Sequence, residues 1–376
     1  MTDGTPDIVV EFPDFGFGPA SSAVEVVRRI GERRRCLLVS TGSALEFAQR
    51  SLPLVPTADL DTFSSAGLAG LAQHVGKEKF VLSVTNPPFA HWAEKEGYRV
   101  GVLDTLHWLW DSSSDAPGRP RFYVAQDYWG PAGANVPVNT VFGRADDAFL
   151  PAARPSRRAL VTFGGMTLPF DDALPLEFAR WALRSVVPVL LRSPEIEGVD
   201  VVGGHPNLGS ACVSWLHDER VRFVGMMSLD EHRAAIASAT VVVATPGIAT
   251  IHELQRAARP AVLMPGFNAS QVLQLRDAVE RYGCPYALEW PAVRSGAAAL
   301  RRLPESEAVA MVARIARHEM LRSAPRRALG TLVARALAAD EPARPLGAEP
   351  WSRDRPQVGE LVAELMEREL SLPVAA

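Results

Sequence analysis

Short runs of apolar, β-branched residues alternate along the first half of the chain with segments whose apolar positions recur every three to four residues. The short runs predict strands and the longer segments predict helices. The predicted strands are Asp7 to Phe12, Cys36 to Ser40, Phe80 to Val84 and Arg99 to Leu103, and the predicted helices are Ser21 to Gly31, Ser43 to Arg50 and Ala90 to Gly97. This alternation is typical of α/β proteins with parallel sheets.

The second half has the same alternation without repeating the sequence. Strands are predicted at Ala159 to Phe163, Val187 to Leu191, Val199 to Val202, Val221 to Val224 and Thr240 to Val243, and helices at Leu176 to Ser185, Glu305 to Met320, Arg326 to Ala339 and Gln357 to Leu370. Two prolines, small residues and arginines at 151–158 indicate a linker. We therefore expect one domain at 1–150, a second at 159–345 and a separate C-terminal helical segment at 346–376.

The stretch from Ala244 to Gln274 is the most informative part of the sequence. A buried strand ends there, Pro246-Gly247 marks a turn, and a helical pattern begins at once. The start of a helix has unpaired amides and the positive end of the dipole, which suits a phosphate. Thr250 adds a hydroxyl, and one turn later Glu253 could accept hydrogen bonds from the vicinal hydroxyls of a ribose. These features predict a nucleotide site; the alternative is an ordinary strand and helix with a surface glutamate.

The segment GIATIHE, the strand-forming RPAVLMPG and the polar turn that follows resemble the donor-nucleotide motif of GT-B glycosyltransferases, most closely the lipid II N-acetylglucosaminyltransferase type. The resemblance implies two Rossmann-like domains facing across a cleft, with a C-terminal helix returning to the first domain. It implies that the glutamate binds ribose, the helix start binds diphosphate and the final glutamine lies near the sugar. The positions assigned to the donor in this way are Gly247, Ile248, Ala249, Thr250, Glu253, Ser270 and Gln271.

Two further turns are candidates for the donor site. Gly164 and Gly165 follow a predicted strand, and paired glycines there allow close backbone approach to a ligand. The resemblance places this turn, with Met166 and Thr167, near the phosphates. It also places Met226 near the uracil ring, although core packing explains a methionine about as well.

The loop after the first predicted strand is expected to face the acceptor, by the same resemblance. Its carboxylate, Asp14, is a candidate general base, and its alternative role is to form a turn or cap a helix. Gly16, Phe17 and Gly18 are candidate substrate contacts, and the two glycines match only part of a dinucleotide fingerprint. Asn86, fixed between a strand and two prolines, could bind a ligand through its amide.

The segment Asp104 to Asp111 places two tryptophans and a histidine after one strand. Trp108 and Trp110 could stack on a flat acceptor, and His107 could serve as a base near neutral pH. The alternatives are aromatic core residues and a histidine held by structural hydrogen bonds.

Composition excludes several classes of function. The 376 residues are 47% hydrophobic and 22% charged with a net charge of −4, which describes a soluble globular protein and argues against nucleic-acid binding. Cys36, Cys212 and Cys284 are widely spaced, so reduced thiols are expected rather than disulfides. The sequence shows no signal peptide and no apolar run long enough to span a bilayer, and we therefore expect a cytoplasmic protein.

The motifs present indicate the mechanism that we expect. The chain has no metal-binding spacing such as H-E-x-x-H, so we expect no metal and no cofactor, only a nucleotide-sugar co-substrate. Helix starts and backbone amides would then stabilise the leaving diphosphate, and one base would activate the acceptor. Direct displacement inverts the anomeric carbon.

For the substrates, DFGFGPASSA and VLDTLHWLWD are similar to segments of cytosylglucuronate synthases of nucleoside-antibiotic biosynthesis. That resemblance implies UDP-glucuronate as donor and N1 of cytosine as acceptor. The alternatives are a transferase for another small or lipid-linked acceptor, a nucleotide-sugar hydrolase or epimerase, and a non-catalytic nucleotide-sugar-binding protein.

Overall fold

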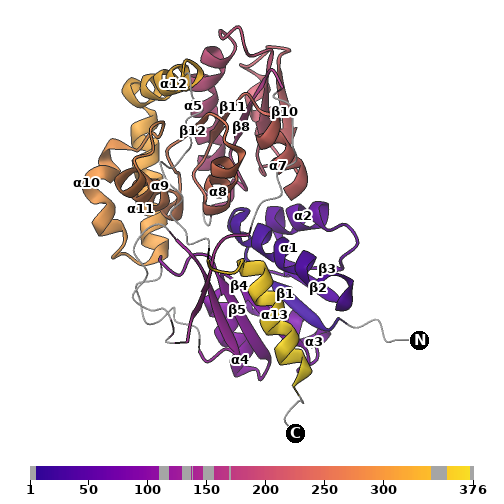
Figure 1. The fold of residues 1–376 in the computed structure, drawn as a ribbon. Coiled ribbons are helices and arrows are strands. Elements are labelled where there is room, and N and C mark those ends of the chain that lie inside the picture. Colours follow the sequence, from indigo (N-terminus) through magenta and orange to yellow (C-terminus); the bar gives the residue numbers. More distant parts are fainter. Residues whose placement is uncertain are drawn as a thin grey trace. The chain divides into compact units, whose positions relative to one another are not determined.

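The computed structural model describes residues 6–109, 118–128, 137, 139–146, 156–168, 171–339 and 354–372. The chain forms two compact units, drawn in Figure 1. Unit 1 consists of residues 1–147 and 351–376, and unit 2 of residues 148–350. Each unit is a parallel sheet with helices, and each is described by itself.

Unit 1 contains a seven-stranded sheet in the order β3-β2-β1-β4-β5-β6-β7. Its strands are β1 Ile8–Glu11, β2 Cys36–Ser40, β3 Thr57–Asp59, β4 Phe80–Val84, β5 Arg99–Asp104, β6 Phe122–Gln126 and β7 Val141–Gly143. Every pairing is parallel. Side chains on both faces of β1 and β4 are buried, which is why these strands are continuous apolar runs in the sequence.

Helices cover both faces of this sheet (Figure 1). They are α1 Gly18–Ile30, the short 3-10 helix η1 Gly31–Arg33, α2 Gly42–Ser51, α3 Ser65–His74, α4 Pro87–Lys95 and α13 Val358–Ser371. On one face Leu71 of α3 and Phe89 of α4 pack against Val9, Val81 and Val102 of the strands. On the other face α1 contacts α2 and α13, and α13 also contacts β5, β6 and β7.

The C-terminal helix α13 belongs to unit 1, as the resemblance to GT-B enzymes implied. It buries Val358, Val362 and Met366. Two arginines at or just after the end of α1 form ion pairs with it, Arg29 with Glu360 at 3.2 Å and Arg34 with Glu367 at 2.8 Å. These pairs help to anchor α13 to α1.

Unit 2 contains a five-stranded parallel sheet in the order β10-β9-β8-β11-β12. Its strands are β8 Arg158–Thr162, β9 Gly198–Val202, β10 Val221–Gly225, β11 Val241–Ala244 and β12 Ala261–Leu263. Its helices are α5 Ala173–Leu190, α6 Leu208–Val213, α7 Leu229–Ser238, α8 Ile248–Ala257, α9 Ala269–Tyr282, α10 Pro291–Leu300, α11 Glu305–Met320 and α12 Ser323–Leu337. An aromatic cluster of Phe178, Trp181, Phe267 and Trp290 forms part of its core.

The strand predicted at Val187 to Leu191 is wrong, because the first four of these residues form the last turn of helix α5 and Leu191 is its C-cap. The β-branched run resembles a strand when it is considered alone. Its burial has helical spacing, however: Leu183, Val186, Val187 and Leu190 are buried while Pro188 is exposed. Packing of this face overrides the local propensity.

The strand order of each sheet reverses beside its central strand. In unit 1 the chain moves outward from β1 to β3 and then returns to β4, and in unit 2 it moves from β8 to β10 and returns to β11. In open parallel sheets ligands bind beyond the carboxyl ends of the strands at such a reversal. The topology therefore points to the ends of β1 and β4 in unit 1 and of β8 and β11 in unit 2.

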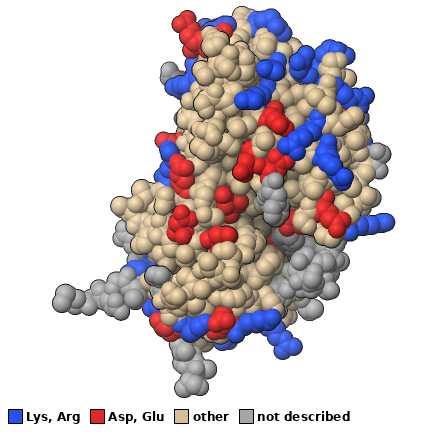
Figure 2. Space-filling view, turned by 180° about the vertical axis from the view of Figure 1, so that it is seen from behind, with Lys and Arg blue, Asp and Glu red and all other residues tan. Residues whose placement is uncertain are grey.

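The described helices include none that is both long and apolar enough to cross a membrane. The face drawn in Figure 2 carries both acidic and basic side chains, scattered among other residues. Several charged side chains of unit 2 form ion pairs, such as Arg317 with Asp171 and Arg222 with Asp200.

Candidate functional site

The N-terminus of α8 lies directly after β11, in the region of the strand reversal in unit 2. Gly247 is its N-cap in an extended conformation and makes no side-chain cap. Within the described part of the chain, the amides of Ile248, Ala249 and Thr250 donate no hydrogen bond; the first to bond is Ile251, to the carbonyl of Gly247 at 2.8 Å. Three amide donors and the positive end of the helix dipole are thus free for an anion.

The glycine turn after β8 occupies the neighbouring strand end, because Thr162 and Ala244 are register partners. Gly164 has φ of +65°, a conformation that favours glycine. A Cβ at Gly164 would lie 3.9 Å from the hydroxyl oxygen of Thr245, in the turn leading to α8. The two glycine turns that the sequence assigned to the diphosphate are therefore brought together, and Gly165, which is buried, lies in the first of them.

Met166 and Thr167 complete this turn in different ways. Met166 also has a positive φ of 58°, and its side chain is buried, with its sulfur 2.6 Å from where a Cβ of Gly203 would lie. It can therefore offer a ligand its backbone rather than its side chain. Thr167 is half-buried, and its hydroxyl donates to the carbonyl of Gly165 at 3.5 Å.

Glu253 is buried within unit 2, only 4% exposed. Its Oε1 accepts a hydrogen bond from Nε of Arg233 at 3.1 Å, and its Oε2 lies 3.4 Å from Nδ1 of His232. The other ring nitrogen of His232 is 3.2 Å from the Thr162 hydroxyl. Helix α8 is thereby tied through α7 to the end of β8, the strand that carries the glycine turn.

The pKa of Glu253 is lowered despite its burial. Burial alone would raise this pKa, but the hydrogen bond to His232 and the charges of His232 and Arg233 outweigh that effect. Glu253 is thus an ionised carboxylate at neutral pH. Each carboxylate oxygen has two lone pairs and uses one here, so each can still accept from a ribose hydroxyl.

The remaining predicted donor residues follow neighbouring strands. Gly225, at the end of β10, has φ of +78°, and half-buried Met226 comes next. After β12, Ser270 donates to the side chain of Asn268 at 3.0 Å, and Oε1 of Gln271 accepts from the amide of Phe267 at 3.1 Å. Within the described residues the Gln271 side-chain nitrogen has no partner, so it remains a donor for a ligand.

In unit 1, Asp14 lies at the end of β1 against the start of α2. Its Oδ1 accepts from the Ser43 hydroxyl and the Ala44 amide, both at 3.0 Å. Gly42, with φ of +57°, leaves room for this carboxylate. Asp14 therefore caps a helix, the alternative role that the sequence suggested, and because it is half-buried it also remains partly open to solvent.

The predicted acceptor residues of the first loop lie at the start of α1. Gly16 has φ of +75°, Phe17 is the N-cap, and Gly18 begins the helix. The ring of Phe17 stacks on Phe47 of α2 with 4.6 Å between ring centroids. One face of Phe17 is thus already covered.

His107 and Trp108 are buried inside the fold, where a substrate does not reach them. Trp108 is 2% exposed and stacks on Tyr128 with centroids 4.1 Å apart. His107 is 3% exposed, its Nδ1 has no hydrogen bond partner within the described residues, and burial lowers its pKa to about 4. His107 is therefore neutral at pH 7 and shielded from solvent. Trp110 lies outside the described residues.

Asn86 is also buried, and it binds Glu11, a residue that the sequence did not point to. Its Oδ1 caps α4 by accepting from Phe89, and its Nδ2 donates to Oε1 of Glu11 at 2.6 Å. Thr62 donates to the same oxygen at 2.6 Å, and Ser83 lies 3.2 Å from Oε2. Glu11 joins β1, β4 and the loop after β3 at the strand reversal of unit 1. An acidic residue ending the buried run Ile8–Glu11 was the signal that could have revealed it.

Glu11 lies in an environment opposite to that of Glu253. It is fully buried, and in the described structure none of its hydrogen-bond partners is cationic. Burial raises its pKa to about 8, even though the hydrogen bonds from Thr62, Asn86 and Ser83 act the other way. Glu11 is therefore a neutral carboxylic acid at pH 7.

The described residues contain no group of three or more His, Cys, Asp or Glu side chains placed to hold a metal ion. Cys36 and Cys212 are buried, and Cys284 is half-buried.

No protein-family model and no curated protein sequence matches the chain. Solved structures do match. The glycotransferase of kitacinnamycin aligns at 15% identity with a TM-score of 0.50, covering 99% of this chain and 100% of that one. MnaA of S. aureus with UDP aligns at 12% identity and a TM-score of 0.51, covering 91% and 93%. The spinosyn rhamnosyltransferase SpnG with thymidine diphosphate aligns at 11% identity and a TM-score of 0.50, covering 95% and 99%.

The chain has the GT-B fold. The match extends over nearly the whole of each compared chain, and the two parallel sheets with a returning C-terminal helix agree with it. The expected fold class is therefore confirmed. The roles of the individual site residues stay predictions.

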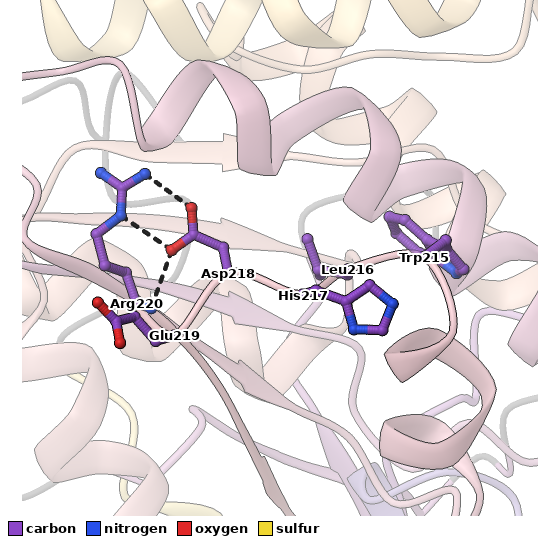
Figure 3. A pocket seen from close by; sticks show the side chains of 6 residues that line it. All are labelled: Trp215, Leu216, His217, Asp218, Glu219 and Arg220. Carbon is purple, nitrogen blue, oxygen red and sulfur yellow. Dashed lines mark hydrogen bonds and ion pairs between the residues drawn. The ribbon is translucent and has the colours of Figure 1, made fainter.

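A shallow pocket elsewhere in unit 2 contains none of the predicted residues. It is lined by Trp215, Leu216, His217, Asp218, Glu219 and Arg220 (Figure 3). These residues form the loop before β10, at the amino end of the sheet, whereas the glycine turns follow the carboxyl ends. The Arg220 guanidinium forms an ion pair with Asp218 and lowers the pKa of that carboxyl to about 2, so Arg220 already has an acidic partner within the loop. We attach no function to this pocket.

Proposed function

We propose that this protein is a glycosyltransferase that moves a sugar from a nucleotide-sugar donor to a small acceptor. The observation that carries the proposal is the pair of glycine turns after β8 and β11. There the unbonded amides at the start of α8 lie beside the strand end that carries Gly164, which has no side chain to obstruct a ligand. The GT-B fold supports it, since two of the similar structures contain a nucleoside diphosphate. The ionised Glu253 supplies a partner for the ribose.

In the proposed donor complex the diphosphate lies on the amides of Ile248, Ala249 and Thr250, with Gly164 close to its other side. The leaving diphosphate gains negative charge as its bond to the sugar breaks, and fixed amide donors stabilise that charge without reorganising. Glu253 accepts from the ribose hydroxyls. Met226 contacts the base, and Gln271 donates through its side-chain nitrogen to the sugar.

The proposed reaction is a direct displacement that needs no metal. The acceptor nitrogen or oxygen loses a proton to a base and forms a bond to the anomeric carbon. The bond from that carbon to the diphosphate oxygen breaks, and its electron pair leaves with the diphosphate. Attack from the opposite side inverts the anomeric centre.

Asp14 is the better of the two candidate bases. It is a half-buried carboxylate at the strand reversal of unit 1, where the acceptor is expected. His107 is buried, and its lowered pKa makes it a weak base. The more specific proposal, from the resemblance of two segments, is transfer from UDP-glucuronate to N1 of cytosine.

The first test is a panel of UDP-sugars incubated with the protein, with and without cytosine, while UDP release is measured. Release that depends on both UDP-glucuronate and cytosine supports the specific proposal. Release without any acceptor indicates a hydrolase. UDP binding without turnover on any donor and acceptor indicates a binding protein, and contradicts the transferase.

The second test concerns the ribose. Replacing Glu253 with Gln or Ala removes a charged acceptor, and we expect UDP affinity to fall about 10- to 100-fold in calorimetry. Glu289→Ala is the matched control, because Glu289 is also buried in unit 2 with two arginine partners, Arg276 and Arg294. It should lower stability and leave UDP affinity unchanged. Equal UDP affinity in folded Glu253 variants and wild type would remove the ribose assignment.

A further inference from the structure

Phe63 is the one aromatic residue among the large hydrophobic side chains that the described structure leaves exposed; 66% of it is open to solvent. It follows β3, whose last residue Asp59 pairs with Ser40 at the end of β2. Phe63 therefore lies beyond the carboxyl edge of the unit 1 sheet, the edge at which Asp14 and Glu11 also lie. In parallel α/β sheets this is the edge that binds ligands.

The backbone that carries Phe63 is held on both sides. Before it, the Thr62 hydroxyl donates to Glu11 at 2.6 Å and accepts from Asn86 at 3.2 Å. At Phe63 itself the amide donates to Oδ1 of Asp61 at 3.0 Å. After it, the hydroxyl of Ser64 caps α3 by accepting from the Gly67 amide at 3.0 Å. An apolar ring is thus presented to water from a fixed loop.

Among the described residues of this unit, two aromatic rings that the sequence proposed for substrate binding are already covered. Trp108 stacks on Tyr128, and Phe17 stacks on Phe47. Trp108 therefore stacks on another residue of the protein rather than on a ligand, whereas the ring of Phe63 is exposed to solvent. A phenylalanine side chain has only two rotatable bonds, so on a backbone that is already held it loses little conformational entropy when it stacks on a ligand.

We propose that Phe63 stacks on the acceptor and that the acceptor is a planar heteroaromatic ring bearing N–H groups. This inference rests on the proposed function. The ring chemistry follows from the neighbouring charge: exposed Asp61 uses one carboxylate oxygen on the Phe63 amide, and the other can accept from an N–H group of the ligand. The same carboxylate disfavours an anionic acceptor.

The test measures binding of cytosine and of benzoate to the full chain by ligand-observed NMR titration, with UDP titrated separately by calorimetry. Cytosine is planar, neutral and has N–H groups, whereas benzoate is planar and anionic. Phe63→Ala removes the ring, Phe63→Leu keeps an apolar but non-planar side chain, and Phe63→Trp keeps a flat ring. Leu54→Ala is the matched control, because Leu54 is 95% exposed in the loop before β3, at the opposite edge of the sheet.

We expect wild type, Phe63→Trp and Leu54→Ala to bind cytosine alike and more tightly than benzoate. Phe63→Ala and Phe63→Leu should bind cytosine about tenfold more weakly or worse. UDP affinity should be the same in every variant.

Two results would overturn the inference: cytosine binding that is unchanged in Phe63→Ala and Phe63→Leu, or wild type that binds no cytosine. Benzoate binding as tight as that of cytosine would refute the stated ring chemistry. A wild type that fails to bind UDP contradicts the proposed function instead, and the cytosine titration still decides the role of Phe63.

Discussion

Replacing Glu11 with Gln should make unit 1 more stable at neutral and alkaline pH. The hydrogen bonds around Glu11 indicate a protonated acid. Ser83 has one hydroxyl proton and lies 3.0 Å from the Asn86 carbonyl as well as 3.2 Å from Oε2 of Glu11. If the hydroxyl donates to the carbonyl, Oε2 must supply the proton of the second bond. A glutamine amide can donate in the same place, while its oxygen accepts from Thr62 and Asn86.

The magnitude follows from the two pKa values of the same carboxyl. In the unfolded chain the pKa of Glu11 is near 4.5, and in the folded chain burial raises it to about 8. The folded state therefore keeps a proton that the unfolded state releases, so stability is fully present below the unfolded pKa and falls as pH rises towards the folded pKa. The loss is about 1.4 kcal/mol per pH unit, or about 3 kcal/mol by pH 7.

The assay compares thermal unfolding of wild type and Glu11→Gln at several pH values from 5 to 9. Every other titrating group is common to both proteins, so the difference between them isolates Glu11. We expect the advantage of the glutamine variant to grow between about pH 5 and pH 8 and then level off. For a unit of this size about 3 kcal/mol corresponds to a shift of about 6–12 °C in melting temperature.

The result that refutes this reasoning is a difference between the two proteins that does not change with pH, because Glu11 would then titrate alike in the folded and unfolded chain. Glu11→Ala provides the structural control. It leaves Thr62 and Asn86 without their shared acceptor and should lower stability over the whole pH range.

Two further predictions concern the packing of α13 and the reactivity of a thiol. Met366→Ala should lower the free energy of unfolding of unit 1 in urea by about 2–5 kcal/mol, because Met366 is buried. Glu367→Ala breaks only a half-exposed ion pair with Arg34 and should lower it by less than about 1 kcal/mol. Equal losses in the two variants would contradict the greater weight given to the buried methionine. Burial raises the pKa of the Cys36 thiol to about 12, so Cys36 should not react with a thiol reagent at pH 8 until the protein unfolds. Cys36→Ser should therefore leave the number of fast-reacting thiols unchanged.

Much of the fold could be predicted from the sequence because its strands are buried on both faces. Such strands are continuous apolar runs, and Cys36–Ser40 and Phe80–Val84 match their predicted bounds residue for residue. The edge strand β3 has no such signal. The three residues of β3, Thr57–Asp59, are half-buried or exposed, and the sequence analysis missed them. Phe63, which follows β3, was missed for the same reason.

The turns of the donor site could be predicted because their chemistry is local. Gly247 and Gly164 are placed by the strand that each follows, and glycine at a strand end has a direct backbone consequence. The protonation state and the ion pairs of a side chain depend instead on partners that are distant in the sequence. Nothing adjacent to Glu253 indicates that Arg233 and His232, 20 and 21 positions earlier, hold it in an ion pair.

The two buried glutamates show why the state of a carboxylate cannot be assigned from its position alone. Glu11 ends strand β1 and Glu253 lies within helix α8; the first is surrounded by neutral donors and the second by two basic side chains. The first is neutral and its contribution to stability is lost as pH rises. The second is ionised, and because its folded pKa is lowered, its contribution is present above its unfolded pKa and lost as pH falls through the folded pKa. The contribution of Glu11 to the stability of unit 1 should therefore fall as pH rises, and that of Glu253 to unit 2 should fall as pH is lowered. At neutral pH the ionised Glu253 is the stronger acceptor for the hydroxyls of a donor's ribose.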